Sequence, residues 1–178
     1  MAKSPDEEHR RCKKRMEAGD ADAFDCMGAW YFLGEFGLHQ DIDKGLELTI
    51  QAAELGSTNA HYNIANFYSD GQYAPKNAKK ALFHYQQAAM KGHMKARHNL
   101  GYYEVELGSS DRAIKHWMIA TASGEKLSLD SIKLMFAQGS ATKAQYERAL
   151  RAYQIHQEDV HSDQRTRVLE HFQGHTTL

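Results

Sequence analysis

The sequence is poor in cysteine and proline, and it has no long apolar run. Two cysteines and two prolines in 178 residues exclude a secreted scaffold stapled by disulfides, and they leave too few thiols for a cysteine-rich zinc module. The longest strongly apolar stretch, residues 26–33, is far shorter than the ~20 residues that cross a membrane. Residues 1–15 are charged throughout, without the apolar core of a signal peptide. We therefore expect an intracellular protein without a membrane span, with the cytoplasm as the expected compartment and the nucleus as the alternative.

Charge is balanced overall but divided along the chain. The net charge is −1, with 22 lysines and arginines against 23 acidic residues. Residues 20–70 carry nine acids and one lysine, whereas residues 71–103 carry six cations and no acid. The overall balance and the lack of a recognised motif argue against nucleic acid as the partner. An acidic block beside a basic block favours a charged partner or head-to-tail self-association.

Alanine-rich segments that end in glycine recur along the chain. They end at Gly56, Gly92 and Gly124, which are 36 and 32 residues apart. A small residue stands four positions after each glycine, and apolar residues then recur every three or four positions, which is typical of amphipathic helices. No segment shows the two-residue alternation of a strand. The pattern predicts stacked helix pairs and an all-α fold.

Helix boundaries follow from capping residues and glycines. Ser4 before Pro5 marks a helix start, and Thr142 with Gln145 forms a capping-box pair. Glycines after the apolar segments mark helix ends, because glycine adopts the left-handed closing conformation without a Cβ penalty. The predicted helices span residues 4–18, 21–33, 42–55, 58–70, 77–91, 94–107, 110–123, 127–138, 142–158 and 162–173.

Matched repeat positions also predict the packing. The small residues Gly28, Ala65 and Gly101 stand at the centres of the first helices, where they let neighbouring helices approach closely. Aromatic residues at other matched positions are predicted to be core residues. These are Tyr31, Tyr68, Tyr85, Trp117, Phe136 and Tyr153.

The repeated positions resemble the SEL-one-like repeat family, a relative of the tetratricopeptide repeat. The first repeat matches the unit of that family at Ala23, Met27, Gly28, Tyr31, Gly34, Gly37, Leu38, Asp41, Lys44, Ala52, Ala53 and Gly56. The second matches it at Ala60, Ile64, Ala65, Tyr68, Gly71, Lys80, Ala81, Tyr85, Ala88, Ala89 and Gly92. The resemblance implies a right-handed α-α superhelix, a solenoid of stacked antiparallel helix pairs with about four repeats plus capping helices. It also implies use as an adaptor in protein complexes.

With these repeats as the frame, residues 1–178 are predicted to form a single repeat domain. The expected parts are an N-terminal capping helix at 4–19, repeats at 20–56, 57–92 and 93–124, a degenerate repeat at 125–158, and a C-terminal cap and tail at 159–178. The polar residues Arg165, Arg167, Glu170 and His171 are expected on the last capping helix.

Eleven histidines raise the question of metal binding or catalysis. His84 and His116 occupy matched positions in successive repeats, which lie about 10 Å apart and are too distant to share a metal. Cys12 and Cys26 are interpreted as small buried hydrophobes, with a disulfide between them as the alternative. No nucleophile elbow, phosphate-binding loop or dinucleotide fingerprint is present. We therefore predict no enzyme activity, no catalytic residue, no metal and no cofactor.

The predicted function is that of a non-enzymatic scaffold or adaptor, which binds a peptide or partner protein through the concave face of its repeats. By resemblance to tetratricopeptide repeats, this groove is lined by first-helix residues. These are Asp25, Ala29 and Phe32 in the first repeat, Tyr62, Asn66 and Ser69 in the second, and His98, Tyr102 and Val105 in the third. Asn63 and Asn99 stand beside them at a matched position where the family commonly has asparagine for structural reasons. The predicted partner-binding residues are Tyr62, Asn66, Ser69, Lys95, Arg97, His98 and Tyr102. Their amides, aromatic rings and cations suit an extended acidic peptide. The alternatives are a hydrolase or redox enzyme on a repeat solenoid, and a subunit or fragment of a larger complex such as a ubiquitin-ligase adaptor.

Overall fold

This computed structural model describes residues 4–173, with side chains to residue 163. Nine helices and no strand occur within these residues, so the predicted all-α class is confirmed. The helices group into two compact units. We call residues Met1–Ala96 unit 1 and residues Arg97–Leu178 unit 2.

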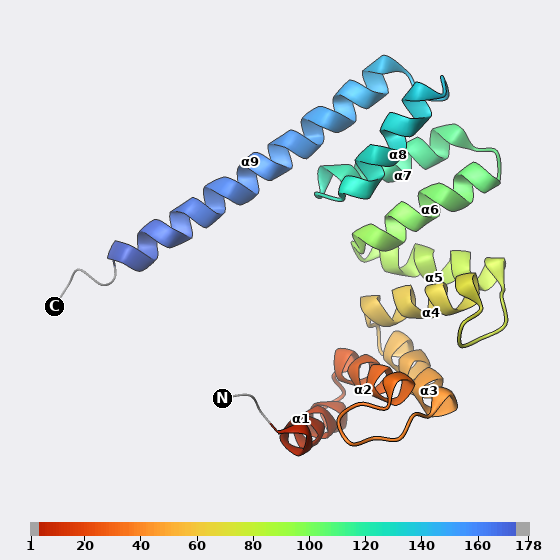
Figure 1. Cartoon of the computed structure of the whole chain (residues 1–178), viewed down its shortest axis with the longest axis vertical. Coiled ribbons are helices and arrows are strands. Elements are labelled where there is room, and N and C mark those ends of the chain that lie inside the picture. Colours follow the sequence, from red (N-terminus) through yellow and green to blue (C-terminus); the bar gives the residue numbers. More distant parts are fainter. Residues whose placement is uncertain (1–3, 174–178) are drawn as a thin grey trace. The chain divides into compact units, whose positions relative to one another are not determined.

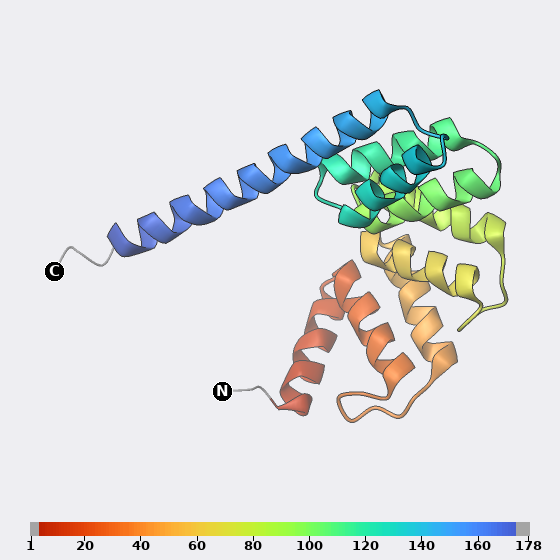
Figure 2. The same ribbon diagram turned by 45° about the horizontal axis from the view of Figure 1, so that its top comes forward.

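Unit 1 is a series of helices in which each packs on the next (Figures 1 and 2). Helix α2 also contacts α4, so the first helices of two successive repeats lie against each other. The five complete helices of the unit are α1 (Pro5–Glu17), α2 (Ala21–Leu33), α3 (Ile42–Glu54), α4 (Thr58–Asp70) and α5 (Ala78–Met90).

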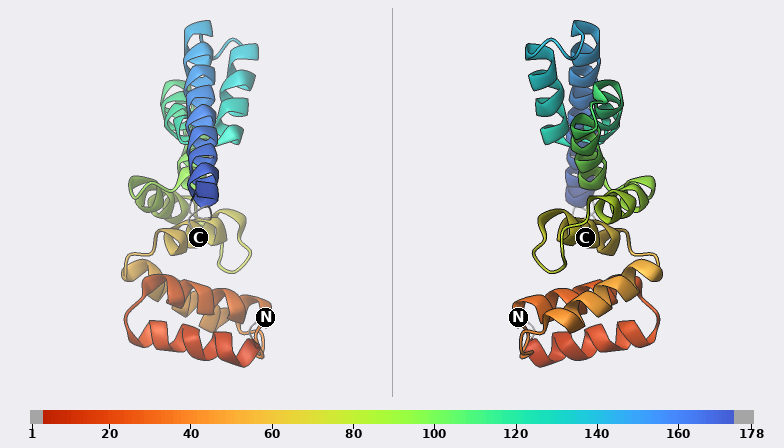
Figure 3. Two further views of the ribbon diagram at one scale, coloured as in Figure 1. Left: turned by 90° about the vertical axis from the view of Figure 1, so that its left-hand side faces the viewer. Right: turned by 90° about the vertical axis from the view of Figure 1, so that its right-hand side faces the viewer.

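Unit 2 holds most of α6 (Met94–Glu106), together with α7 (Ser110–Ala122), α8 (Lys126–Ala137) and α9 (Lys143–Gln173). Helix α9 packs on both α7 and α8 (Figure 3), and its C-terminal part extends beyond them (Figure 1). The core between these three helices is formed by Ala113, Ile114, Trp117, Leu129, Ile132, Met135, Ala141 and Ala149.

Helix ends follow the local sequence signals. The Ser4 hydroxyl accepts a hydrogen bond from the backbone N–H of Glu7 at 3.3 Å, and Pro5 opens α1. Before α9, the Thr142 N–H donates to Gln145 Oε1 at 2.7 Å, while the Gln145 N–H donates to Thr142 Oγ1 at 3.2 Å. The predicted helix starts at Ser4 and Thr142 are confirmed, because each side chain satisfies a backbone donor that the first turn leaves free.

The predicted break between helices at 142–158 and 162–173 is wrong. The structure has one continuous helix, α9, from Lys143 to Gln173. Residues 157–163 contain neither glycine nor proline, so nothing in this segment ends a helix. The side chains of Arg165, Arg167, Glu170 and His171, expected on a capping helix, lie outside the described residues.

Helices α2 and α3 approach closely through glycine. A methyl group built on Gly28 would lie 2.6 Å from Thr49 Oγ1 and 2.9 Å from the carbonyl oxygen of Gly45. The Thr49 hydroxyl donates to that same carbonyl at 3.0 Å. The close approach predicted for this small first-helix residue is confirmed, and it places Thr49 of α3 directly against Gly28 of α2.

The six predicted core aromatics divide into three groups. Tyr31, Tyr68 and Tyr153 are half-buried. Tyr85 and Trp117 are each only 2% exposed, whereas Phe136 is 38% exposed and stacks on Tyr146 with ring centroids 5.5 Å apart. The core prediction for Phe136 is therefore wrong.

The two cysteines are free thiols, so the alternative of a disulfide is absent from this structure. Cys12 is 4% exposed and donates to the Ala23 carbonyl at 3.3 Å. Burial raises the pKa of the Cys12 thiol to about 11, with the neighbouring Cys26 adding to the effect. Cys12 is therefore a buried packing residue with little thiolate character at neutral pH.

Candidate partner-binding pocket

A cavity of about 200 Å³ opens within unit 1 at the faces of α2 and α4. Both are first helices of their repeats, and α3 contributes to the cavity through the close approach at Gly28. The lining residues are Asp25, Ala29, Phe32 and Leu33 of α2, Thr49 of α3, Asn63 and Phe67 of α4, and Tyr73 of the loop that follows α4.

Three aromatic rings form one wall of the pocket. Phe32 and Tyr73 stack with ring centroids 4.4 Å apart. Phe67 meets each of them edge to face, with centroid distances of 5.0 Å. Offset stacking and edge-to-face contact are the favourable arrangements of aromatic quadrupoles. The three rings therefore hold one another in place. Tyr73 reaches the two phenylalanine rings from the loop that begins where α4 ends, at Gly71 in the left-handed conformation (φ +75°).

Asp25 supplies the charge of the pocket. The Asn63 side-chain amide of α4 donates to both carboxylate oxygens of Asp25, at 3.2 and 3.1 Å. Burial raises the pKa of the Asp25 carboxyl, the hydrogen bond from Asn63 opposes this rise, and the like charge of Asp22 adds to it. Among the described residues, no lysine or arginine forms an ion pair with Asp25.

The sequence mapping placed Asp25, Ala29 and Phe32 at the groove, and all three line this pocket. Asn63, which the mapping placed beside the groove in a structural role, lines it as well. The mapping missed Leu33, Thr49, Phe67 and Tyr73. A repeat signal points to Tyr73, since it stands two positions after Gly71 as Phe36 stands two positions after Gly34. Phe36 packs on Trp30 of its own repeat in a tilted arrangement, with ring centroids 4.3 Å apart.

The other residues predicted in unit 1 do not line this pocket. The Tyr62 ring stacks on His93 at 4.3 Å between centroids, and the Asn66 side-chain oxygen accepts a hydrogen bond from the Tyr85 hydroxyl at 2.7 Å. Both side chains therefore already have partners within the unit. Ser69 is half-buried on α4, and Lys95 is exposed near the start of α6.

The predicted residues of unit 2 are Arg97, His98 and Tyr102 of α6. The rings of His98 and Tyr102 meet edge to face, with centroids 4.9 Å apart. Tyr102 is 52% exposed, whereas His98 is 7% exposed, and Arg97 is half-buried. His98 is therefore a packing residue, and its side chain presents little surface to a partner.

Histidine contacts in the structure bear on the enzyme alternative. His98 Nδ1 lies 2.8 Å from the Ser128 hydroxyl, a distance that would suit a base and a nucleophile. Ser128, however, is 0% exposed, so a substrate has no access to its hydroxyl. The contact is a buried hydrogen bond between α6 and α8, and burial is also the main cause that lowers the pKa of His98.

A second pair joins α4 and α5, where His61 Nδ1 lies 3.0 Å from His84 Nδ1. Burial lowers the pKa of His84 to about 4, with the charges of His61 and Lys80 contributing. The neutral rings therefore share one hydrogen bond. In the portion of the chain that the structure describes, no three His, Cys, Asp or Glu residues gather as they would around a metal ion.

Helices long enough to cross a membrane and also sufficiently apolar do not occur among the described residues.

Comparison with known proteins gives one family match and two similar structures. The family model of the Sel1 repeat matches residues 27–57 and 58–93. A protective antigen present in uropathogenic Escherichia coli strains, whose crystal structure displays an SLR fold, is 26% identical with a TM-score of 0.69. The match covers 80% of this chain and 32% of that one, so this chain spans about a third of the length of the antigen.

The crystal structure of a Sel1 repeat protein from Oxalobacter formigenes is also similar, with 25% identity and a TM-score of 0.65 over 71% of this chain and 97% of that chain. A search of the curated proteins found no match.

Proposed function

We propose that this chain, in which two Sel1 repeats occupy residues 27–93, is a non-catalytic scaffold that binds a partner protein through the pocket of unit 1. Sel1 repeat proteins are generally protein-interaction scaffolds. The observation that carries the proposal is the pocket itself, in which the first helices of both repeats present an aromatic wall and a half-buried carboxylate on one surface.

The size of the pocket favours a protein side chain as its occupant. A volume of about 200 Å³ equals that of roughly seven water molecules at ~30 Å³ each. Pockets for drug-sized molecules are larger, about 300–1,000 Å³. A single side chain of a partner protein fits the smaller volume, and buried anchors of this kind dominate the energy of protein interfaces.

The rim of the pocket offers apolar surface to the residues that flank such an anchor. Leu33 is 61% exposed, and Ala29 is exposed beside it on α2. An anchor residue in the pocket and neighbouring residues on this rim would together exclude water from the contact.

Selection from a random peptide display library tests the proposal. Ala29→Trp fills the pocket from its exposed edge without changing a core residue, and Ala78→Trp introduces the same ring at an exposed position of α5. We expect peptides retained by the wild-type protein to bind Ala78→Trp equally and Ala29→Trp about tenfold or more weakly. Circular dichroism would establish that both variants remain helical. Failure to retain any peptide, or equal binding to both variants, would refute the proposal.

The prediction of an acidic peptide near Lys95 is tested in the same selection. Acidic peptides that bind Ala29→Trp normally but lose affinity for Lys95→Glu would place a second contact beside that lysine. Selected peptides without an excess of acidic residues would count against it.

A further inference from the structure

We propose that the pocket accepts an arginine side chain of the partner, with its guanidinium paired to Asp25 and stacked on the half-buried rings of Phe67 and Tyr73. This inference rests on the proposed function, because it names the residue that occupies the same pocket.

The first step of the argument is the charge of Asp25. Its carboxylate is half-buried, and Asn63 is the one side chain that the structure shows donating to it. Asp22 places a second negative charge nearby. A partly buried carboxylate beside a like charge is stabilised by a cation that enters the site. Within the described residues no cation fills this role.

The second step is the hydrogen-bonding capacity that Asp25 retains. An ionised carboxylate offers about four acceptor sites on its two oxygens, and the Asn63 amide contacts each oxygen once. Both oxygens can therefore still accept from two N–H groups of one guanidinium, which is the bidentate arrangement typical of arginine–carboxylate pairs.

The third step is the accessible part of the aromatic wall. Phe67 and Tyr73 are half-buried, while Phe32 is 5% exposed and supports Tyr73 from within the wall. A guanidinium is planar and weakly hydrated, so it stacks on aromatic rings while it pairs with a carboxylate. An ammonium is compact and strongly hydrated, and it forms neither the stacked nor the bidentate contact. The combination of aromatic rings and the Asp25 carboxylate therefore favours arginine over lysine in this pocket.

The charge of the surrounding sequence agrees with this assignment. Residues 20–70, which contribute seven of the eight lining residues, carry nine acids and one lysine. A segment of this charge attracts a basic partner and repels an acidic one. A neutral side chain in the pocket would remove water from Asp25 without supplying a compensating charge, which disfavours it.

Four pools of fluorescein-labelled short peptides test the inference by fluorescence polarisation. Each pool has random flanking residues and one fixed central residue, which is arginine, lysine, citrulline or glutamate. Citrulline keeps the planar shape of arginine and removes its charge. We expect the arginine pool to bind the wild-type protein about tenfold or more tightly than the citrulline pool, with lysine between them and glutamate weakest.

Two variants with the same change of charge complete the experiment. Asp25→Asn should reduce binding of the arginine pool to that of the citrulline pool. Glu54→Gln changes an exposed acid of the same unit and should leave the preference for arginine intact. The comparison of arginine with citrulline on the wild-type protein stands even if Asp25→Asn fails to fold.

The outcomes separate this inference from the proposed function. Equal binding of the arginine and citrulline pools, with loss of both in Ala29→Trp, would overturn the arginine assignment and leave a pocket that takes other side chains. Displayed peptides that need the pocket but contain no arginine would have the same meaning. Absence of binding by every pool and every displayed peptide would overturn both proposals.

Discussion

The indole of Trp117 occupies the space that a side chain at Gly101 would take. A methyl group built on Gly101 would first meet atoms Nε1, Cδ1 and Cε2 of that ring. Trp117 is 2% exposed, and its Nε1–H donates to the backbone carbonyl of His98 at 3.0 Å. Helix α6 can therefore pack closely against Trp117 of α7 because it has a glycine, Gly101, at the contact.

Gly101→Ala is expected to destabilise the protein by about 1–3 kcal/mol, because the added methyl group has no room beside Trp117. Helix propensity acts in the opposite direction, since alanine is favoured over glycine by about 1 kcal/mol in a helix interior. Urea unfolding of the variant and the wild type measures the difference. A variant more stable than the wild type would contradict the tight contact.

Truncation of a core residue should cost far more than truncation of a surface residue. Leu100 is 3% exposed, so Leu100→Ala should lower the free energy of unfolding by about 2–5 kcal/mol. Lys79 is exposed, and Lys79→Ala should change it by no more than about 0.5 kcal/mol. Urea melts provide the comparison, and equal losses in the two variants would show that the repeat frame is misplaced.

Acid should destabilise the fold through its buried and half-buried histidines. Burial lowers the pKa of His84 from 6.5 to about 4, so the unfolded chain binds more protons than the folded one in this range. The contribution of neutral His84 to the free energy of unfolding is therefore complete above pH 6.5, and it is lost as the pH falls toward about 4. The pKa values of four further histidines are lowered in the same direction, mainly by burial. These are His61, His93, His98 and His116.

Urea melts above and below pH 6.5 measure this effect, and His84→Asn isolates one contribution. The asparagine amide can still hydrogen-bond to His61 but does not take up a proton. We expect the variant to lose less stability on acidification than the wild type does. An identical loss in both proteins would remove His84 from the explanation.

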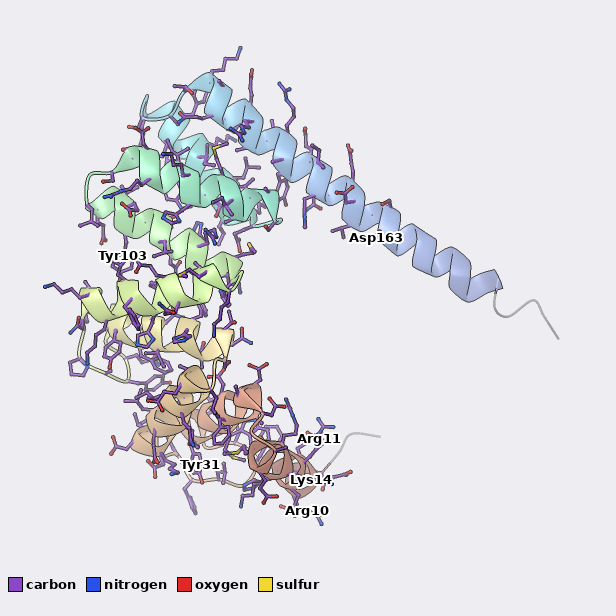
Figure 4. All side chains as sticks on the ribbon, turned by 180° about the vertical axis from the view of Figure 1, so that it is seen from behind. Arg10, Arg11, Lys14, Tyr31, Tyr103 and Asp163 are labelled. Carbon is purple, nitrogen blue, oxygen red and sulfur yellow. The ribbon has the colours of Figure 1, made fainter. Side chains whose placement is uncertain are left out.

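Salt should weaken any association of the chain with itself. Residues 71–103 carry six cations and no acid, whereas residues 20–70 carry nine acids and one lysine. Arg10, Arg11 and Lys14, which project from α1 (Figure 4), add positive charge at the start of the chain. If copies associate head to tail through these charges, sedimentation at low salt should show oligomers. They should dissociate as salt is raised, because the Debye length falls from about 10 Å at 0.1 M to about 3 Å at 1 M. A monomer at every salt concentration would exclude this contact.

Much of the fold could be predicted because its determinants are local. The Thr142–Gln145 pair and the Ser4–Pro5 start act over a single turn, so they can be recognised without any tertiary information. The spacing of small residues likewise predicted the close approach at Gly28. The error in α9 was also local, since a helix break was expected at residues 159–161, where no residue ends a helix.

The pocket could be predicted only in part, because its walls come from distant segments. Asp25, Ala29 and Phe32 lie on one helix face and follow from the repeat frame. Tyr73 joins Phe32 only after the loop beyond α4 returns along the unit, a path that helical periodicity does not describe.

The sequence by itself determined the helices, their caps and the repeat of small and bulky positions, since each depends on residues within a few turns of one another. Tertiary structure decided which polar residues line the pocket. His98 and Asp25 occupy comparable first-helix positions, yet His98 is covered through its contacts with Ser128 and Trp117, whereas Asp25 lines an open pocket beside Asn63. Burial depends on the side chains that neighbouring helices contribute, and those neighbours are brought together only when the chain folds.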